Sequence, residues 1–95
     1  MIASFRCKET EKIFNRQFSH KLPHDIQRIA MRKIWQIDAA AKIDDLRLPP
    51  GNHLEILKGD RKGHYSIRIN QQFRICFLWD GKNANSVEIV DYHRG

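Results

Sequence analysis

The sequence predicts an α+β domain in which an N-terminal strand and two helices pack on one face of an antiparallel sheet. A change of hydrophobic period supports this prediction: apolar residues recur at helical spacing up to about residue 41, and from about residue 53 they alternate with polar ones. The order of the patterns, which is one strand, two helices and four consecutive strands, supports it as well. Because 95 residues can build one hydrophobic core but not two, we expect a single domain over residues 1–95.

The first half of the chain contains the predicted N-terminal strand and both helices. Ile2-Ala3-Ser4-Phe5 alternates as a short edge strand does. Helix one is expected from about Lys8, with acidic side chains in its first turn, where they suit the helix dipole. Helix two is expected from Pro23, which suits a first turn, to about Ala41. Its apolar stripe consists of Ile26, Ile29, Ala30, Ile34 and Ile37.

Helix two carries a second apolar face almost opposite this stripe, where Trp35 lies in line with Met31 and Ala39. Two apolar faces require two neighbours. In one interpretation, helix one packs there and forms a helical pair with helix two. In the other, the flanking Arg28 and Arg32 make this face a surface for a partner protein.

Four strands follow the only long loop of the chain. They are expected at residues 53–57, 65–70, 73–79 and 87–90. Alternation places Ile67 and Ile75 on a face that needs a cover, and it places Arg68 and Arg74 on a face that is left open. A tight hairpin is expected at Asn70, because asparagine accepts a positive backbone angle at modest cost.

Composition and charge narrow the class of protein. Seventeen Lys and Arg against eleven Asp and Glu give a net charge of +6, which favours a polyanion such as nucleic acid, or an acidic protein partner. Cys7 and Cys76 show no paired spacing and fit free thiols in a reducing cytosol. No segment approaches the roughly 20 apolar residues of a membrane helix. We therefore expect a soluble, cytoplasmic protein without a membrane partner.

The candidate chemistry depends on polar residues near the strand ends. The chain has no P-loop, dinucleotide-binding glycine pattern or nucleophile elbow, and its five histidines lack zinc-ligand spacing, so we expect no metal and no cofactor. A basic turn with Arg61 and Lys62 adds cations at one end of the sheet, and these are candidates for RNA binding together with Arg68. Strand alternation can bring together a set of groups that suits cleavage of an RNA backbone: Glu55, Lys58, Arg68, Arg74, Asp91, Tyr92 and His93.

Cleaving RNA without a metal requires a base for the 2′-hydroxyl, charge stabilisation of a phosphorane and an acid for the departing 5′-oxygen. His93 can act as general acid or base, because histidine titrates near neutral pH. Asp91 or Glu55 could serve as the complementary base or orient the imidazole. The planar fork of Arg74 fits two phosphate oxygens, and Lys58 adds a compact charge.

Tyr92 could stack on a splayed base, as aromatic side chains do in single-strand RNA recognition. Each of these residues also has a simpler interpretation. The terminal Asp-Tyr-His could cap an edge strand, Arg68 and Arg74 could be solvated cross-strand charges, and Tyr92 could belong to the core. His53 and His64 are expected at the surface rather than in the site.

Two segments, GNHLEILKGDRKGHYSIRINQQFRICFLW and VEIVDYH, closely resemble the HigB toxins of the RelE/ParE superfamily of bacterial toxin–antitoxin modules. The resemblance looks full length, since MIASFRCKETEKIF and the IDAA of helix two also fit. It implies the small RelE/ParE-like fold and a ribosome-dependent mRNA endonuclease that inhibits translation. It also implies a helix-turn-helix, HigA-like antitoxin that binds the toxin, so that the toxin meets promoter DNA only through their complex.

Carried over by position, the family's catalytic and phosphate-binding residues fall on Lys58, Arg74, Asp91, Tyr92 and His93. Glu55 stands where some members carry a histidine, which leaves the general base open. Two other functions also stay open. A ParE-type toxin shares the fold but acts on DNA gyrase and needs no acid–base group, so the C-terminal Asp-Tyr-His argues against it. A non-catalytic nucleic-acid-binding regulator would need only the net charge of +6.

Overall fold

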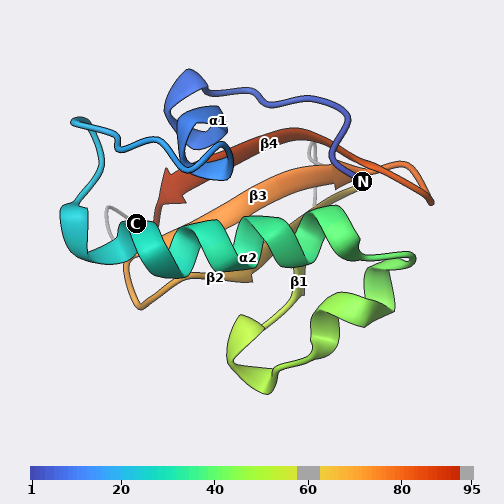
Figure 1. Ribbon diagram of the computed structural model, residues 1–95. Coiled ribbons are helices and arrows are strands. Elements are labelled where there is room, and N and C mark those ends of the chain that lie inside the picture. Colours follow the sequence, from blue (N-terminus) through green and yellow to red (C-terminus); the bar gives the residue numbers. More distant parts are fainter. Residues whose placement is uncertain (58–62, 93–95) are drawn as a thin grey trace.

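The computed structural model describes residues 1–57 and 63–92, in which helices cover one face of a four-stranded sheet (Figure 1). The helices are α1 (Lys8–Phe14) and α2 (Gln27–Ala39), and the short 3₁₀ helices are η1 (His24–Ile26), η2 (Ile43–Arg47) and η3 (Pro50–Asn52). The strands are β1 (Glu55–Ile56), β2 (His64–Arg68), β3 (Phe73–Trp79) and β4 (Ala84–Asp91). The predicted α+β class is confirmed. Within the described ranges, no helix is long and apolar enough to cross a membrane.

The sheet is an antiparallel meander in the order β1-β2-β3-β4. The predicted N-terminal edge strand is present only as isolated bridges, which join Ile2 to Ala84 and Phe5 to Val87. Both bridges are parallel, and the N–H of Ala3 donates to the carbonyl oxygen of Ala84 at 2.7 Å. The N-terminal segment therefore lies at the edge of the sheet beside β4, as predicted, and its two bridges to β4 run in the parallel direction.

The hairpin between β2 and β3 is confirmed, but its turn forms in another way than predicted. Asn70 is not among the described residues with a positive φ. Instead, its side-chain carbonyl oxygen accepts the backbone N–H of Gln72 at 2.8 Å and that of Phe73 at 2.7 Å. Asparagine stabilises such turns with its side chain, so no positive backbone angle is needed here.

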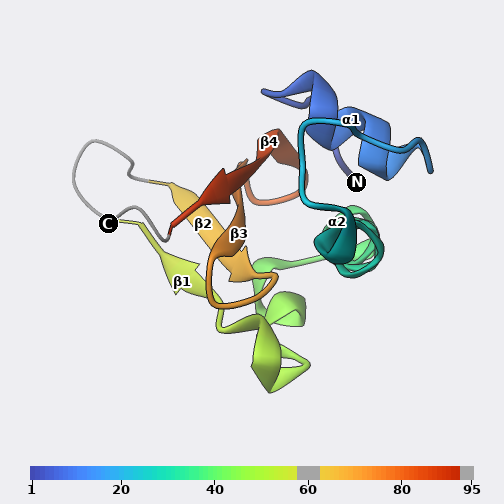
Figure 2. The same cartoon turned by 90° about the vertical axis from the view of Figure 1, so that its left-hand side faces the viewer.

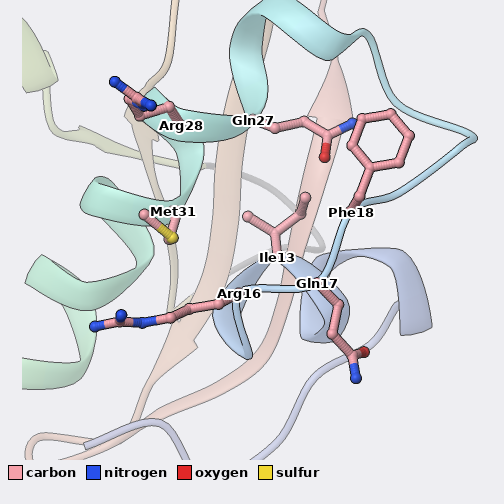
Figure 3. A pocket seen from close by; sticks show the side chains of 7 residues that line it. All are labelled: Ile13, Arg16, Gln17, Phe18, Gln27, Arg28 and Met31. Carbon is pink, nitrogen blue, oxygen red and sulfur yellow. The ribbon is translucent and has the colours of Figure 1, made fainter.

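The two helices lie on the same side of the sheet, with α1 beside both α2 and β4 (Figure 2). Helix two begins as η1 and ends at Ala39, two residues before the predicted end. The indole N–H of Trp35 donates to the carbonyl oxygen of Phe14 at 3.1 Å, so the end of α1 covers the second apolar face of α2. This contact confirms the helical pair. A hollow of about 410 Å³ nevertheless remains open between α1 and the start of α2 (Figure 3).

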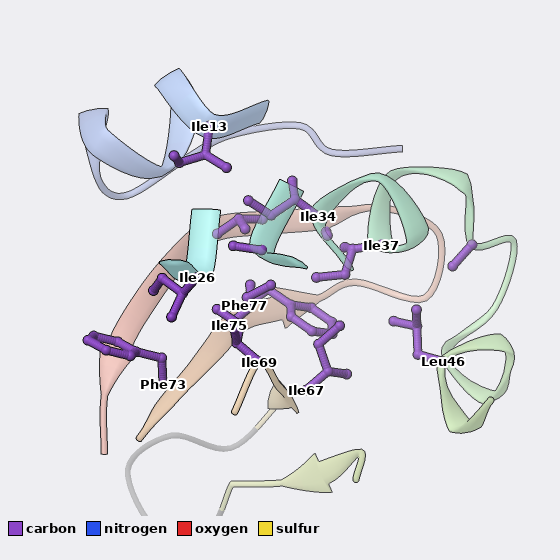
Figure 4. Close-up of a cluster of buried hydrophobic side chains, with 14 residues drawn as sticks. Ile13, Ile26, Ile34, Ile37, Leu46, Ile67, Ile69, Phe73, Ile75 and Phe77 are labelled. Carbon is purple, nitrogen blue, oxygen red and sulfur yellow. The ribbon is translucent and has the colours of Figure 1, made fainter. Parts of the chain in front are cut away.

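The hydrophobic core fills the space between α2 and the sheet (Figure 4). Its largest fully buried side chains include Ile34, Ile37, Ile67, Ile75 and Phe77. The predicted stripe of helix two is confirmed except at Ile29, which is 44% exposed. At about 100° per residue, Ile29 points well to one side of the stripe centred on Ala30 and Ile37. The helices thus cover the isoleucine face of the sheet and leave the arginine face to the other side.

Candidate active site

A polar hollow of about 420 Å³ opens on the sheet face opposite the helices. Arg68 and Arg74 are cross-strand partners, and alternation points both side chains away from the buried Ile67 and Ile75. The hollow is lined by His53, Glu55, Arg68, Asn70, Gln71, Arg74 and Tyr92. The structure thus brings together four of the residues that the sequence singled out, namely Glu55, Arg68, Arg74 and Tyr92.

Arg74 is the one buried residue in the described lining of this hollow, and it is only 8% exposed. Its Nε donates to Ser66 Oγ at 2.8 Å, and its Nη2 donates to the carbonyl oxygens of His53 at 2.5 Å and Ser66 at 3.3 Å. Glu55 Oε1 lies 3.6 Å from the same Nη2. Arg74 lies on the sheet face opposite the helices, as predicted, but its side chain is not open to solvent, because the segment from His53 to Glu55 folds over it. The alternative of a solvated cross-strand charge is wrong for the same reason.

His53 reaches Arg74 because the chain turns sharply at the end of η3. Its backbone is left-handed, with φ 43 and ψ 58, and its N–H donates to the carbonyl oxygen of Pro50 at 3.1 Å. Non-glycine residues are uncommon in this region, and such outliers cluster at functional sites. His53 is exposed, as predicted. The prediction that it lies outside the site is wrong, because it lines the hollow. The sequence did contain an indication of this position. In the strand predicted at residues 53–57, alternation places His53 on the same face as Glu55.

Asn52 fixes this turn to the helical layer. It is fully buried, and its carboxamide nitrogen donates to the carbonyl oxygens of Leu46 and Leu48, both at 3.2 Å. Its carboxamide oxygen accepts a hydrogen bond from the ammonium group of Lys33, and burial lowers the pKa of that group. The loop that carries His53 is therefore anchored by hydrogen bonds of Asn52 to α2 and to the loop's own backbone.

Tyr92 forms the outer wall of the hollow. The guanidinium carbon of Arg74 lies 5.9 Å from the centroid of its ring, and its hydroxyl lies 3.7 Å from Cys76 Sγ. The backbone N–H of Tyr92 donates to the carbonyl oxygen of Gln72 at 2.6 Å. The residue is 37% exposed, so the interpretation of Tyr92 as a core side chain is wrong. Its exposed ring surface is available for stacking with a base.

Arg68 and Asn70 form the side of the hollow next to the β2–β3 turn. Nε of Arg68 donates to the carbonyl oxygen of Asn70 at 3.1 Å. Arg68 is half-buried, and Gln71, which the sequence analysis did not single out, is exposed beside it. This side of the hollow therefore offers a second guanidinium and a carboxamide.

The structure does not place Asp91 in the lining of the hollow. Asp91 pairs with the core-facing Phe73, so alternation turns its side chain to the other face from that of Tyr92. Its Oδ2 accepts a hydrogen bond from Gln72 Nε2 at 3.1 Å. Four further residues predicted for the site lie outside the described residues: Lys58, Arg61, Lys62 and His93. Among the residues described, no three His, Cys, Asp or Glu side chains gather closely enough to hold a metal ion.

Comparison with known proteins first defines the class of the fold. The structure resembles YafQ from Escherichia coli strain BL21(DE3) with a TM-score of 0.59, over 99% of this chain and 97% of that one. At 10% sequence identity this likeness shows the fold alone.

Sequence comparison then defines the family. Residues 3–93 match the family of RelE-like toxins of the type II toxin–antitoxin system HigB. The chain is 41% identical over 96 residues to Toxin HigB-1 of Vibrio cholerae serotype O1, with 99% of each chain covered. It is 34% identical over 94 residues to Endoribonuclease HigB of Proteus vulgaris, covering 98% of this chain and all of that one. The chain therefore belongs to the HigB family of RelE-like toxins. It is the toxin half of a toxin–antitoxin pair, and the ParE-type alternative is not favoured.

Proposed function

We propose that this toxin is an endoribonuclease that cleaves mRNA on the ribosome through attack of an RNA 2′-hydroxyl, without a metal. The observation that carries the proposal is the arrangement of Arg74, whose guanidinium is buried, fixed by hydrogen bonds and directed at a polar hollow. Fixed donors of this kind stabilise developing charge because they need no reorganisation during the reaction. The relative from Proteus vulgaris is named an endoribonuclease, which supports the same chemistry here.

The guanidinium of Arg74 retains donors for a substrate. Ser66 and His53 engage its Nε and Nη2, and no described residue accepts a hydrogen bond from its Nη1. An arginine donates five N–H bonds in a fixed plane, so Nη1 can bind a phosphate oxygen while the other two nitrogens hold the plane in place. Tyr92, at the edge of the same hollow, would stack on the base next to the scissile phosphate.

Acid–base catalysis requires two further groups. Glu55 supplies a carboxylate that is 54% exposed at the hollow, and we assign it the removal of the 2′-hydroxyl proton. His93 would then protonate the 5′-oxygen, and Lys58 would neutralise the phosphorane. Asp91, whose carboxylate accepts a hydrogen bond from Gln72 outside the lining, is left without a role in this step. Arg61, Lys62 and Arg68 would bind the RNA backbone. The imidazole of His53 lies in the same lining and is the second candidate for the base.

The proposed function also requires the ribosome and an antitoxin as partners. The proposed groups are too few to impose an in-line geometry on free RNA, so we propose that the ribosome positions the mRNA in the cytoplasm. The antitoxin would be a helix-turn-helix, HigA-like protein that binds the toxin and carries it to promoter DNA. Purified toxin should therefore cut bare RNA far more slowly than ribosome-bound mRNA.

Growth and transcript mapping after induction without the antitoxin test the function. We expect the native chain to arrest growth with loss of mRNA and new internal 5′ ends. Arg74→Lys should fail to do so, because lysine keeps the charge but cannot form the planar fork. Arg47→Lys, at an exposed salt bridge with Asp44 away from the hollow, is the matched control. Growth arrest with intact transcripts and cleaved DNA would instead identify a gyrase poison.

A further inference from the structure

The hollow between α1 and α2 has an apolar floor and charged walls. Ile13 forms the floor and is buried, whereas Phe18, on the opposite side from α2, is 48% exposed. In Figure 3, Met31 lies between Arg16 and Arg28, and Phe18 lies across Ile13 from them. The hollow therefore presents an apolar centre flanked by two cations.

Arg16 occupies a position where helices usually carry glycine. The N–H of Arg16 donates to the carbonyl oxygen of Ile13 at 3.1 Å, and that of Gln17 donates to the carbonyl oxygen of Lys12 at 2.8 Å, which is the Schellman pattern. Arg16 itself is left-handed, with φ 63. Its guanidinium carbon lies 4.7 Å from the centroid of the Trp35 ring. An arginine thus takes an unfavourable backbone conformation and is held on an indole face beside the hollow.

Neither cation of the hollow is neutralised within the described part of the chain. Arg16 and Arg28 are both exposed, and neither lies within salt-bridge distance of a described carboxylate. By contrast, Arg6, Lys12 and Arg47 each pair with a glutamate or an aspartate. Two unneutralised guanidiniums around an apolar centre attract carboxylates to this part of the surface.

The wall of the hollow opposite α2 is held in place by hydrogen bonds within the chain. Gln27 is buried, and its Nε2 donates to the carbonyl oxygens of Ser19 at 2.7 Å and Leu22 at 3.0 Å. The N–H of Ser19 donates back to Gln27 Oε1 at 3.1 Å, and Ser19 Oγ donates to Glu9 Oε1 at 2.6 Å. These bonds fix the segment that carries Phe18, so a ligand meets a preformed shape and binding requires little ordering.

We propose that this hollow binds an acidic amphipathic helix of the cognate antitoxin. An apolar side chain of that helix enters over Ile13 between Phe18 and Met31, and carboxylates on either side of it pair with Arg16 and Arg28. A nucleic acid would bring phosphates and flat bases, whereas an amphipathic helix presents an aliphatic side chain and carboxylates on one face, which matches both the floor at Ile13 and the two arginines. The proposal rests on the family assignment and does not depend on the proposed nuclease chemistry.

Calorimetric titration of the purified toxin variants with the purified cognate antitoxin tests the proposal. Arg16→Gly removes the guanidinium and supplies the residue that the left-handed backbone prefers, so the fold is retained. Arg28→Ala removes the second cation from an exposed helix position. Each should weaken binding by about tenfold, since each removes one partner of an interfacial charge pair. Lys82→Ala removes the same charge from the exposed β3–β4 turn and should leave the affinity unchanged.

Melting curves and ribosome-bound mRNA cleavage complete the experiment. The variants should have the melting temperature of the parent. They should also cleave mRNA at the parental rate, because neither arginine lines the Arg74 hollow. Antitoxin affinity within about twofold of the parent in the double variant would overturn the proposal. Loss of ribosome binding with antitoxin affinity retained would also overturn it and assign the hollow to RNA. If the parent cuts no RNA while the Arg16 and Arg28 variants still lose antitoxin affinity as expected, the proposed nuclease function is refuted and this binding site is supported.

Discussion

The two hollows of this toxin have nearly the same volume, about 420 Å³ and about 410 Å³, yet they hold their arginines in opposite ways. In the hollow on the open sheet face, Arg74 is buried and donates three hydrogen bonds to protein acceptors. In the hollow between α1 and α2, Arg16 and Arg28 are exposed and meet no described carboxylate. A fixed guanidinium suits a charge that develops during a reaction, whereas exposed guanidiniums suit attraction of a partner.

The surroundings of these arginines differ in the same sense. Ser66, Glu55 and the carbonyl of His53 surround Arg74 with polar acceptors. In the other hollow, Met31 lies between Arg16 and Arg28, and the apolar Ile13 and Phe18 lie beside them (Figure 3). The sheet and its buried core separate the two hollows. Substitutions in one hollow should therefore leave the function of the other unchanged, because distant sites that share no contacts behave additively.

Replacing Arg74 by lysine should have the largest effect. Loss of the fixed fork should lower the single-turnover cleavage rate of ribosome-bound mRNA by about 10²–10³-fold. The pH profile should keep its shape, because no acid–base group changes, and antitoxin affinity should remain at the parental value. A cleavage rate within about threefold of that of the Arg47→Lys control would mean that Arg74 takes no part in the reaction.

Replacing Tyr92 tests the wall of the same hollow. Tyr92→Ala should weaken binding of the ribosome-bound mRNA by about 1–3 kcal/mol, which is the usual contribution of a base stacked on an aromatic ring. Tyr92→Phe keeps the ring and should bind as the parent does. If phenylalanine proves as damaging as alanine, the hydroxyl beside Cys76 is the important group and stacking is not.

Replacing Ser66 by alanine tests the support of Arg74. The buried Nε then loses its acceptor, which should cost about 1–3 kcal/mol of unfolding free energy. Below the melting temperature kcat should fall by about tenfold while KM stays unchanged, because the guanidinium is misoriented only where charge develops. An unchanged kcat in a destabilised variant would mean that Ser66 only supports the fold.

Glu9 gives the smallest expected effect, and it concerns the hollow between α1 and α2. The hydroxyl of Ser19 donates to its carboxylate and lowers the pKa of Glu9. A lowered pKa in the folded state means that this stabilisation is complete above the unfolded pKa and is lost as the pH falls through the folded one. The difference in urea midpoint between the parent and Glu9→Gln should therefore shrink between about pH 6 and about pH 3. A constant difference would exclude the carboxylate charge as its cause.

Much of the fold could be predicted from the sequence because periodicity reports which face a side chain occupies. Alternation separates Ile67 and Ile75 from Arg68 and Arg74, and four of the five stripe positions that helical spacing predicts over η1 and α2 are buried. Alternation does not report what covers a face. The burial of Arg74 depends on the left-handed turn at His53, which links parts of the chain 21 residues apart.

The other differences between prediction and structure also concern contacts between distant parts of the chain, which alternation does not report. The parallel pairing of Ile2 and Phe5 with β4 depends on where the chain enters the sheet, and local alternation carries no information on direction. Alternation and the family resemblance both predict Asp91 in the site beside Tyr92, although adjacent strand residues point to opposite faces. The sequence pattern does not indicate a role for Arg16, because that role depends on a backbone angle and on a contact with Trp35.

The most direct test of the proposed chemistry is the cleavage of one ribosome-bound mRNA whose scissile nucleotide carries either a 2′-hydroxyl or a 2′-hydrogen. The mechanism predicts that the first message is cut to a 2′,3′-cyclic phosphate and a 5′-hydroxyl, and that the second stays intact at that position. Cleavage of the deoxy-substituted message at the same bond, or products that carry a 5′-phosphate, would show that the 2′-hydroxyl is not the nucleophile and would contradict the assignment of the Arg74 hollow.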